Sequence, residues 1–181
     1  MARGLILAVR HPRPIVGART CIGRTDVGLA APAEAEAERL LAVIEEPIER
    51  IVSSPLIRAL DVARAIARQT GAPLHADDRL TEQDFGAWEG KPWASLPRAE
   101  MAAWQADPIH QAPGGGESVS AMLRRVRHAW TRLASSEETT LVMTHAGPIQ
   151  CLLHVAAAMR LADAVAHSMP YGAVVRLEAR L

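Results

Sequence analysis

The chain contains no asparagine, one lysine (Lys91) and only two cysteines, Cys21 and Cys151, in 181 residues. Two cysteines far apart in sequence cannot form a disulfide framework, so we expect free thiols and a reducing compartment. No apolar run reaches transmembrane length, and the apolar run before Arg10 is too short for a signal peptide. These absences predict a cytoplasmic protein that does not bind a membrane.

The formal net charge is zero, because 20 lysines and arginines balance 20 aspartates and glutamates. A neutral chain has no global basic field to attract nucleic acid. Nearly all of its cations are arginines, whose planar fork pairs with phosphate or carboxylate through two hydrogen bonds. The length predicts a single domain over residues 1–181, which would act as a monomer or a homodimer on a small ligand.

Short apolar runs alternate with amphipathic stretches along the chain. We expect strands at 5–9, 50–53 and 139–144, a brief strand within 73–80, and an edge strand with one wet face at 173–181. Helices are expected at 33–46, 55–70, 117–134 and 148–159, with a weakly helical stretch at 93–105 that Pro97 interrupts. Ser54 is expected to cap the second helix, with Pro55 at its first position. This order predicts the α/β class, as a three-layer α/β/α fold with a mostly parallel sheet and helices on both faces.

Polar residues follow three of the expected strands at the point where each strand ends. Arg10 and His11 follow the first, Arg58 comes soon after the second, and His145 follows the strand at 139–144. The carboxyl ends of parallel strands meet at one edge of a sheet, so we expect these side chains to lie together. Helix starts after Ser54 and Gly147 would add free backbone amides. The arrangement predicts a site for a phosphate-sized anion.

Each of these residues also has a simpler explanation. Arg10 and His11 could begin a solvated loop, Arg58 could be an exposed helix arginine, and His145 could be structural. The convergence of all four on one edge favours a site. Such a site still lacks an acid, for which Glu82 in the irregular middle of the chain is the candidate.

Five segments together resemble the histidine phosphatase superfamily, in the branch related to cofactor-dependent phosphoglycerate mutases. They are Arg10-His11, Ser53-Ser54-Pro55-Leu56-x-Arg58-Ala59, Leu80-x-Glu82-x-Asp84-Phe85-Gly86-x-Trp88-Glu89-Gly90, Gly115-Gly116-Glu117-Ser118 and Val142-x-Thr144-His145-Ala146-Gly147. The segments occur in the family's order, and the resemblance covers nearly the whole chain, from Leu5 to about Gly172. The chain is most similar to small bacterial members of the alpha-ribazole phosphatase type.

The resemblance implies a metal-independent phosphatase, with no cofactor and a phosphoglycerate mutase-like fold. His11 would be the nucleophile and Glu82 the general acid and base. Arg10, Arg58 and His145, together with Ala146 at the start of the next helix, would bind the phosphoryl group. A backbone carbonyl would fix the tautomer of His11.

The implied reaction is phosphomonoester hydrolysis through a covalent phosphohistidine on a small phosphorylated metabolite. Alpha-ribazole 5′-phosphate, a cobalamin-biosynthesis substrate, is one candidate, and a sugar phosphate or a nucleotide fits the same core. Two alternatives remain. One is phosphoglycerate mutase-like phosphotransfer, and the other is a non-catalytic phospholigand- or protein-binding module on the same fold.

The chain departs from the family pattern directly after His11. Pro12-Arg13-Pro14 replaces the usual Gly-Glu-Thr or Gly-Gln-Ser, and the asparagine that many relatives use to touch phosphate is missing, with Gly17 at about its place. Arg13 or Arg19 could replace that ligand, although solvated loop charges are the favoured interpretation.

Loops at 12–28, 85–104 and 170–172 would shape the rest of the pocket. Packing is the favoured role for Trp88, Trp93 and Trp104, with the lining of a substrate mouth as the alternative.

Overall fold

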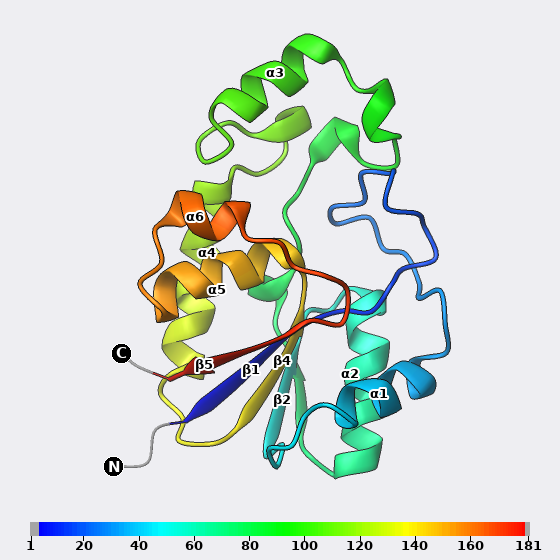
Figure 1. Ribbon diagram of the computed structural model, residues 1–181, viewed down its shortest axis with the longest axis vertical. Helices are drawn as coiled ribbons and strands as arrows, with labels where there is room; N and C mark the ends of the chain where they lie inside the picture. Colours follow the sequence, from blue (N-terminus) through cyan, green and yellow to red (C-terminus); the bar gives the residue numbers. More distant parts are fainter. Residues whose placement is uncertain (1–3, 180–181) are drawn as a thin grey trace.

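The computed structural model describes residues 4–179, which form a five-stranded sheet with helices on both of its faces (Figure 1). The strand order is β3-β2-β4-β1-β5, and the strands are β1 (Leu5–Arg10), β2 (Arg50–Ser53), β3 (Leu74–Ala76), β4 (Thr140–Thr144) and β5 (Val174–Glu178). The first four in this order are parallel, whereas β5 pairs antiparallel with β1. The predicted mostly parallel sheet and the edge position of the last strand are confirmed.

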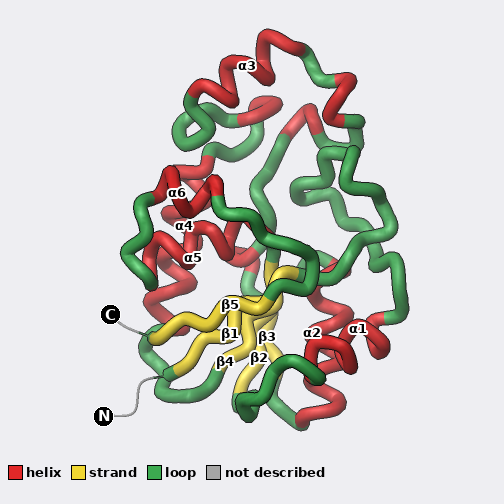
Figure 2. The backbone as a smooth tube through the Cα atoms, in the orientation of Figure 1, coloured by secondary structure: helices red, strands yellow, loops and turns green. Residues whose placement is uncertain are grey.

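Helices α1 (Ala33–Leu41) and α2 (Ile57–Thr70) cover one face of the sheet. Helices α4 (Val119–Leu133), α5 (Ala146–Ala156) and α6 (Leu161–Ala166) lie on the other side, and α3 (Arg98–Ala106) lies beyond the end of the strands (Figure 2). The predicted three-layer architecture is confirmed. Within residues 4–179, no helix has the length and apolar character that a bilayer span requires.

Strand β1 lies in the interior of the molecule, and its side chains are buried on both faces of the sheet. Ile6 and Ala8 join the apolar cluster under α4 and α5, while Leu7 and Val9 join the cluster under α1 and α2. Successive strand residues point to opposite faces, so a strand covered on both sides is apolar throughout. The same burial places Arg10 at the edge of the sheet, where β1 ends.

The start of α2 differs from the prediction. The helix begins at Ile57, and Oδ1 of Asp26 accepts a hydrogen bond from the Ile57 amide at 2.7 Å. Ser54 lies outside the helix, and its hydroxyl is 2.8 Å from Nε2 of His145. The prediction of Ser54 as N-cap and Pro55 as first helical residue is therefore wrong: Oγ of Ser54 accepts from the amide of Leu56 at 3.3 Å, before the helix begins, and Asp26 binds the first helical amide.

Other helix and strand boundaries can also be compared with the predicted ones. Helix α1 ends at Leu41 rather than 46. The interruption predicted at Pro97 is confirmed, because the stretch at 93–105 divides there into a 3₁₀ turn (Trp93–Ser95) and α3. Helix α4 begins at Val119 with Ser118 as its N-cap, so Glu117 precedes the helix. Strand β3 covers only Leu74–Ala76.

The C-terminal third also differs from the prediction. Helix α5 begins two residues before Pro148, which is tolerated in the first turn. The chain then turns through Ala158, whose φ is +53°, into α6, a helix that the sequence pattern did not predict. Strand β5 ends at Glu178, and the predicted strand residues 180 and 181 lie outside the described residues.

The segment between β3 and α4 forms a cap with its own small apolar core. Trp88 and Leu96 are buried there together with Cys21 from the loop between β1 and α1, and Phe85, Trp93, Met101 and Trp104 pack against them. Cys21 and Cys151 are both free and buried. The cap lies beyond the edge of the sheet at which β1, β2 and β4 end (Figures 1 and 2).

Candidate active site

The ends of three neighbouring strands bring the predicted site residues together. The amide of His11 donates to the carbonyl of Thr144 at 2.8 Å, and the amide of Ser54 donates to that of Met143 at 2.9 Å. These bonds continue the pairing of β1, β4 and β2 past the ends of the strands. The predicted convergence is thus confirmed at the carboxyl edge of the sheet.

His11 is 4% exposed, and its Nδ1 lies 2.6 Å from the carbonyl oxygen of Pro12. A carbonyl can only accept, so Nδ1 carries the hydrogen and Nε2 holds the lone pair. Nε of Arg58 donates to this Nε2 at 3.3 Å. Burial, reinforced by the positive charges of Arg58 and Arg10, lowers the pKa of His11 to about 3. The imidazole is therefore neutral at physiological pH.

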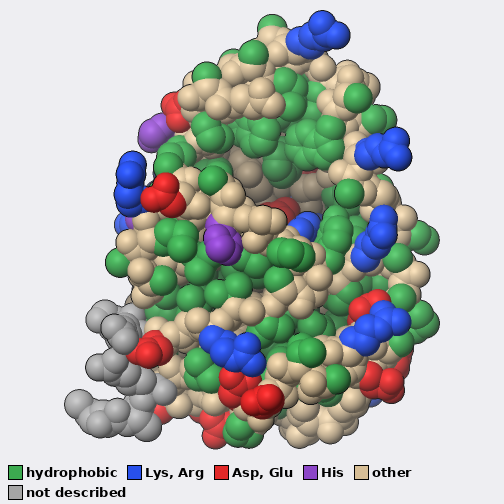
Figure 3. All heavy atoms as spheres, in the orientation of Figure 1, with side chains coloured by type: hydrophobic (Ala, Val, Ile, Leu, Met, Phe, Trp, Pro, Cys, Tyr) green, Lys and Arg blue, Asp and Glu red, His purple; other side chains and the backbone are tan. Residues whose placement is uncertain are grey.

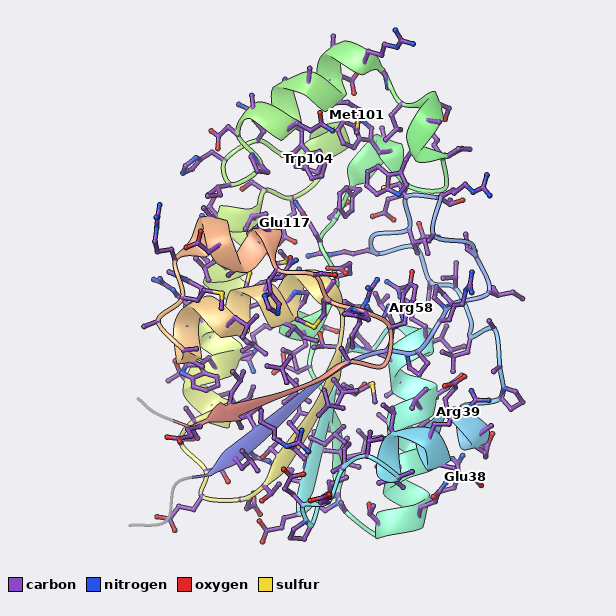
Figure 4. All side chains as sticks on the ribbon, in the orientation of Figure 1. Glu38, Arg39, Arg58, Met101, Trp104 and Glu117 are labelled. Carbon is purple, nitrogen blue, oxygen red and sulfur yellow. The ribbon has the colours of Figure 1, made fainter. Side chains whose placement is uncertain are left out.

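Arg58 points from the first turn of α2 into the site, although only 2% of it is exposed (Figure 4). Its two terminal nitrogens donate to the carbonyls of Thr25 at 2.9 Å and Gly23 at 2.6 Å. The loop before α1 thus holds the guanidinium in place. An arginine fixed in this way needs no reorganisation to meet an anion.

Arg10 is held against Tyr171, a residue that the sequence patterns identified only as part of a loop. The guanidinium carbon lies 3.9 Å from the centroid of the Tyr171 ring, which is a cation–π contact. Nη1 of Arg10 donates to the carbonyl of Met169. Nε of Arg10 is buried and has no hydrogen-bond partner among residues 4–179.

His145 is fully buried beside His11, with the ring centroids 5.0 Å apart. Nε2 of His145 is 2.8 Å from Oγ of Ser54, whereas its Nδ1 is buried without a partner in the described chain. Burial and the neighbouring His11, Arg58 and Arg10 hold the pKa of His145 well below its usual value. A second neutral imidazole therefore adjoins the first.

Glu82 reaches the site from the segment after β3. Its Oε1 accepts hydrogen bonds from the amides of Gln83 at 3.0 Å and Gly147 at 3.1 Å. Burial raises the pKa of Glu82, while these bonds and the charges of Arg58 and Arg10 oppose the rise. The carboxyl lines the same pocket as His11.

The amide of Gly147 is engaged by Glu82, and that of Ile57 by Asp26, so the expectation of free amides at both helix starts is wrong for these two groups. Ala146 is the first residue of α5 and lies directly after His145. Its contact with phosphate stays a prediction.

A group of charged residues holds the backbone of Glu82. Arg125 donates to the carbonyl of Thr81 at 2.7 Å and to that of Glu82 at 2.9 Å. Arg24 donates to the same Glu82 carbonyl at 3.2 Å. Glu117 pairs with both arginines, at 2.8 Å and 3.2 Å. The sequence patterns missed these contacts, because three segments far apart in the chain contribute to them.

The altered segment after His11 keeps its backbone bonds. The Pro12 carbonyl fixes the His11 ring, and the Arg13 carbonyl accepts from the amide of Ala30 at 2.9 Å. Neither contact needs the amide that proline lacks. Arg13 and Arg19 are exposed and line no part of the site pocket, which agrees with their interpretation as solvated charges.

The site opens into a pocket of about 210 Å³ between the sheet edge and the cap. Figure 3 shows a hollow on this face, rimmed by hydrophobic side chains and with charged atoms inside it. All three predicted loops contribute lining residues, among them Ile22, Trp93 and Tyr171. Trp88 is buried, as its predicted packing role requires, and Trp93 both packs against the cap core and lines the pocket. Among residues 4–179 there is no cluster of three or more metal-ligating side chains.

Comparisons with known proteins agree with this geometry. A bifunctional protein of Mycobacterium tuberculosis is 41% identical over 114 residues, covering 60% of this chain and 31% of the relative. The chain thus spans about a third of that relative's length. An adenosylcobalamin/alpha-ribazole phosphatase of Salmonella typhimurium is 31% identical over 112 residues, covering 59% of this chain and 55% of the relative.

Among solved structures, a mycobacterial glucosyl-3-phosphoglycerate phosphatase superposes with a TM-score of 0.81 at 27% identity, over 96% of this chain and 89% of that one. The family model of the histidine phosphatase superfamily (branch 1) matches residues 6–180. With His11, the two arginines and the acid lining one pocket and His145 buried beside His11, the chain belongs to branch 1 of the histidine phosphatase superfamily.

Proposed function

We propose that this protein hydrolyses phosphomonoesters through a covalent phosphohistidine on His11. One observation carries the proposal. The bond from Nδ1 to the Pro12 carbonyl, at 2.6 Å, leaves the lone pair of Nε2 in the pocket beside Arg58. A neutral imidazole with a fixed tautomer and an adjacent cation is a nucleophile prepared for phosphorus.

In the first step Nε2 attacks phosphorus in line, the N–P bond forms and the ester P–O bond breaks. Glu82 gives its proton to the departing alkoxide. In the second step a water attacks the phosphohistidine, Glu82 takes the proton of that water, and the N–P bond breaks to release inorganic phosphate. His11 and Glu82 thereby return to their starting states.

Three side chains would stabilise the charge on the phosphoryl oxygens. The guanidinium groups of Arg10 and Arg58 both line the pocket. Nδ1 of His145, the ring nitrogen without a partner among the described residues, is the third group available to a phosphoryl oxygen. Fixed donors of this kind act most strongly in a site that excludes water.

The environment of Glu82 fits an acid that must hold a proton when the substrate arrives. Burial raises its pKa, and the dianionic phosphate would raise it further. Both backbone amides bind Oε1, so the other oxygen is the one that can carry the transferable proton.

For the physiological substrate we propose a small phosphorylated metabolite, with alpha-ribazole 5′-phosphate as one candidate. The candidate rests on the similarity to the Salmonella typhimurium phosphatase. A phosphomonoester panel ranked by kcat/KM, with this compound included, would test it. A low kcat/KM for alpha-ribazole 5′-phosphate relative to the other esters would exclude it as the physiological substrate.

Rapid-quench labelling tests the mechanism. Wild-type protein mixed with a ³²P-labelled phosphomonoester and quenched in alkali should retain label that acid then releases. His11→Ala should retain none, whereas His128→Ala, which changes an exposed histidine, should label like the wild type. Hydrolysis of p-nitrophenyl phosphate by His11→Ala at the wild-type rate would refute the proposal. A non-catalytic binding module would give no label at all, and a mutase would return the label to a second ester.

A further inference from the structure

A second pocket of about 210 Å³ adjoins the phosphate site. Glu82 and Phe85 line both pockets and therefore stand between them. The first pocket contains His11, Arg10 and Arg58. If His11 attacks phosphorus and Glu82 protonates the ester oxygen, that oxygen lies at the boundary. The second pocket then lies on the side of the departing alcohol.

The walls of the second pocket are largely apolar, and besides the Glu82–Phe85 segment and the first turns of α5 they come from three further stretches of the chain. Trp104 extends from α3 toward the body of the protein (Figure 4), Pro108 follows that helix, Val119 belongs to α4 and Val165 to α6. Trp104 thus lines a pocket in addition to its predicted role, which is to pack in the cap core. Trp93 and Tyr171 add aromatic surface at the mouth of the first pocket.

The two side-chain amides of the second pocket already donate to backbone carbonyls, whereas Nε1 of Trp104 is buried without a hydrogen-bond partner among the described residues. The side-chain amide of Gln83 donates to the Glu117 carbonyl at 2.7 Å. That of Gln150 donates to the carbonyls of Val165 and His167, both at 3.0 Å. Their N–H groups are therefore held by the backbone.

Positive charge is confined to the phosphate side. Of the described residues, no lysine or arginine lines the second pocket, and only Arg10 and Arg58 line the first. Both are within the phosphate site. A carboxylate or second phosphate on the alcohol would lie beside Glu82 in apolar surroundings without a counter-ion, which is strongly unfavourable.

We infer that this protein selects phosphomonoesters of uncharged, apolar or aromatic alcohols, and that the alcohol occupies the second pocket. The inference rests on the proposed function and names its substrate class. It favours a neutral nucleoside 5′-phosphate over any phosphoglycerate derivative.

Two substrate pairs with leaving alcohols of similar acidity test the inference. Benzyl phosphate should exceed ethyl phosphate in kcat/KM by about tenfold or more, since a hydrophobic pocket discriminates on this scale. Glycerol 3-phosphate should exceed 3-phosphoglycerate in kcat/KM, because 3-phosphoglycerate carries a carboxylate in place of the terminal hydroxymethyl group. Equal values within both pairs, or a preference for 3-phosphoglycerate, would overturn the inference.

Variants connect the preference to the pocket. Trp104→Leu should reduce the benzyl-over-ethyl ratio severalfold while leaving inhibition by inorganic phosphate unchanged. Met101→Ala is the matched control, because Met101 packs in the same aromatic cluster but lines neither pocket. Val165→Lys should reverse the preference toward 3-phosphoglycerate. The inference fails if Met101→Ala matches Trp104→Leu.

Binding separates this inference from the proposed function. Benzylphosphonate cannot be hydrolysed and should bind at least tenfold more tightly than ethylphosphonate by calorimetry. If no ester is hydrolysed but benzylphosphonate is preferred, the proposed function fails and the pocket assignment stands. If esters are hydrolysed without any preference in either assay, the pocket assignment fails alone.

Discussion

The backbone amide of Gly147 donates a hydrogen bond to Oε1 of Glu82 at 3.1 Å. This contact joins the first turn of α5 to a segment 65 residues earlier in the chain. It fixes the proposed acid relative to His145, two residues before Gly147 in sequence. The position of the acid thus depends on the absence of a side chain at residue 147.

Gly147→Ala should therefore impair catalysis more than folding. A Cβ there would lie 2.5 Å from Oε1 of Glu82 and 2.9 Å from Cε of Met122, both at the ends of side chains that can move. Displacing the carboxyl by about 1 Å should lower kcat about 100-fold, with a small change in Tm. Gly28→Ala is the control, since its Cβ meets nothing within 4 Å. Wild-type kcat in Gly147→Ala would contradict the prediction.

Glu82→Gln should separate the two chemical steps. With p-nitrophenyl phosphate, whose leaving group needs no proton, we expect a burst of about one nitrophenolate per enzyme followed by slow turnover. With benzyl phosphate both steps need the carboxyl, so kcat should fall about 10²- to 10⁴-fold. Stopped-flow absorbance measures the burst.

The wild-type pH profile gives a second measure of Glu82. Because the acid must be protonated and its pKa is raised, kcat/KM for benzyl phosphate should decline as pH rises through that pKa. Asp84→Asn, which changes a nearby carboxylate, should keep this decline. If kcat/KM of Asp84→Asn no longer fell with rising pH, Asp84 rather than Glu82 would be the general acid.

His11 should make the fold sensitive to acid. Its pKa falls from 6.5 in a model peptide to about 3 in the fold, so the folded state binds fewer protons between these values. The free energy of unfolding therefore rises with pH across this range. At pH 5, keeping His11 neutral in the fold lowers that free energy by about 2 kcal/mol. His11→Asn should lose less stability than wild type between pH 7 and pH 5 in urea titrations. Equal losses would show that other groups dominate.

Arg125 should act on catalysis through the backbone of Glu82. Arg125→Met removes the donors to the carbonyls of Thr81 and Glu82 and leaves Glu117 with Arg24 alone. We expect kcat to fall about tenfold with little change in KM, since misplacement of an acid acts on the chemical step. Arg124→Met changes an exposed neighbour on the same helix and should behave like the wild type. Equal kinetics in the two variants would exclude the positioning role.

The sequence by itself determined the parts of this protein that depend on local pattern. Apolar runs buried on both faces marked β1 and β4, and the polar residues after them had to lie at the carboxyl edge of a parallel sheet. For this reason Arg10, His11 and His145 were predicted together.

Only the tertiary structure decided which partner each group takes. Ser54 has the local signature of a helix cap, yet its hydroxyl is bound to His145 from another strand. Tyr171 stacks on Arg10 although 161 positions separate them in the sequence. Contacts between distant segments leave no periodic signal in either segment, because they depend on how the layers pack. The second pocket has the same origin, since its walls come from α3, α4, α5 and α6.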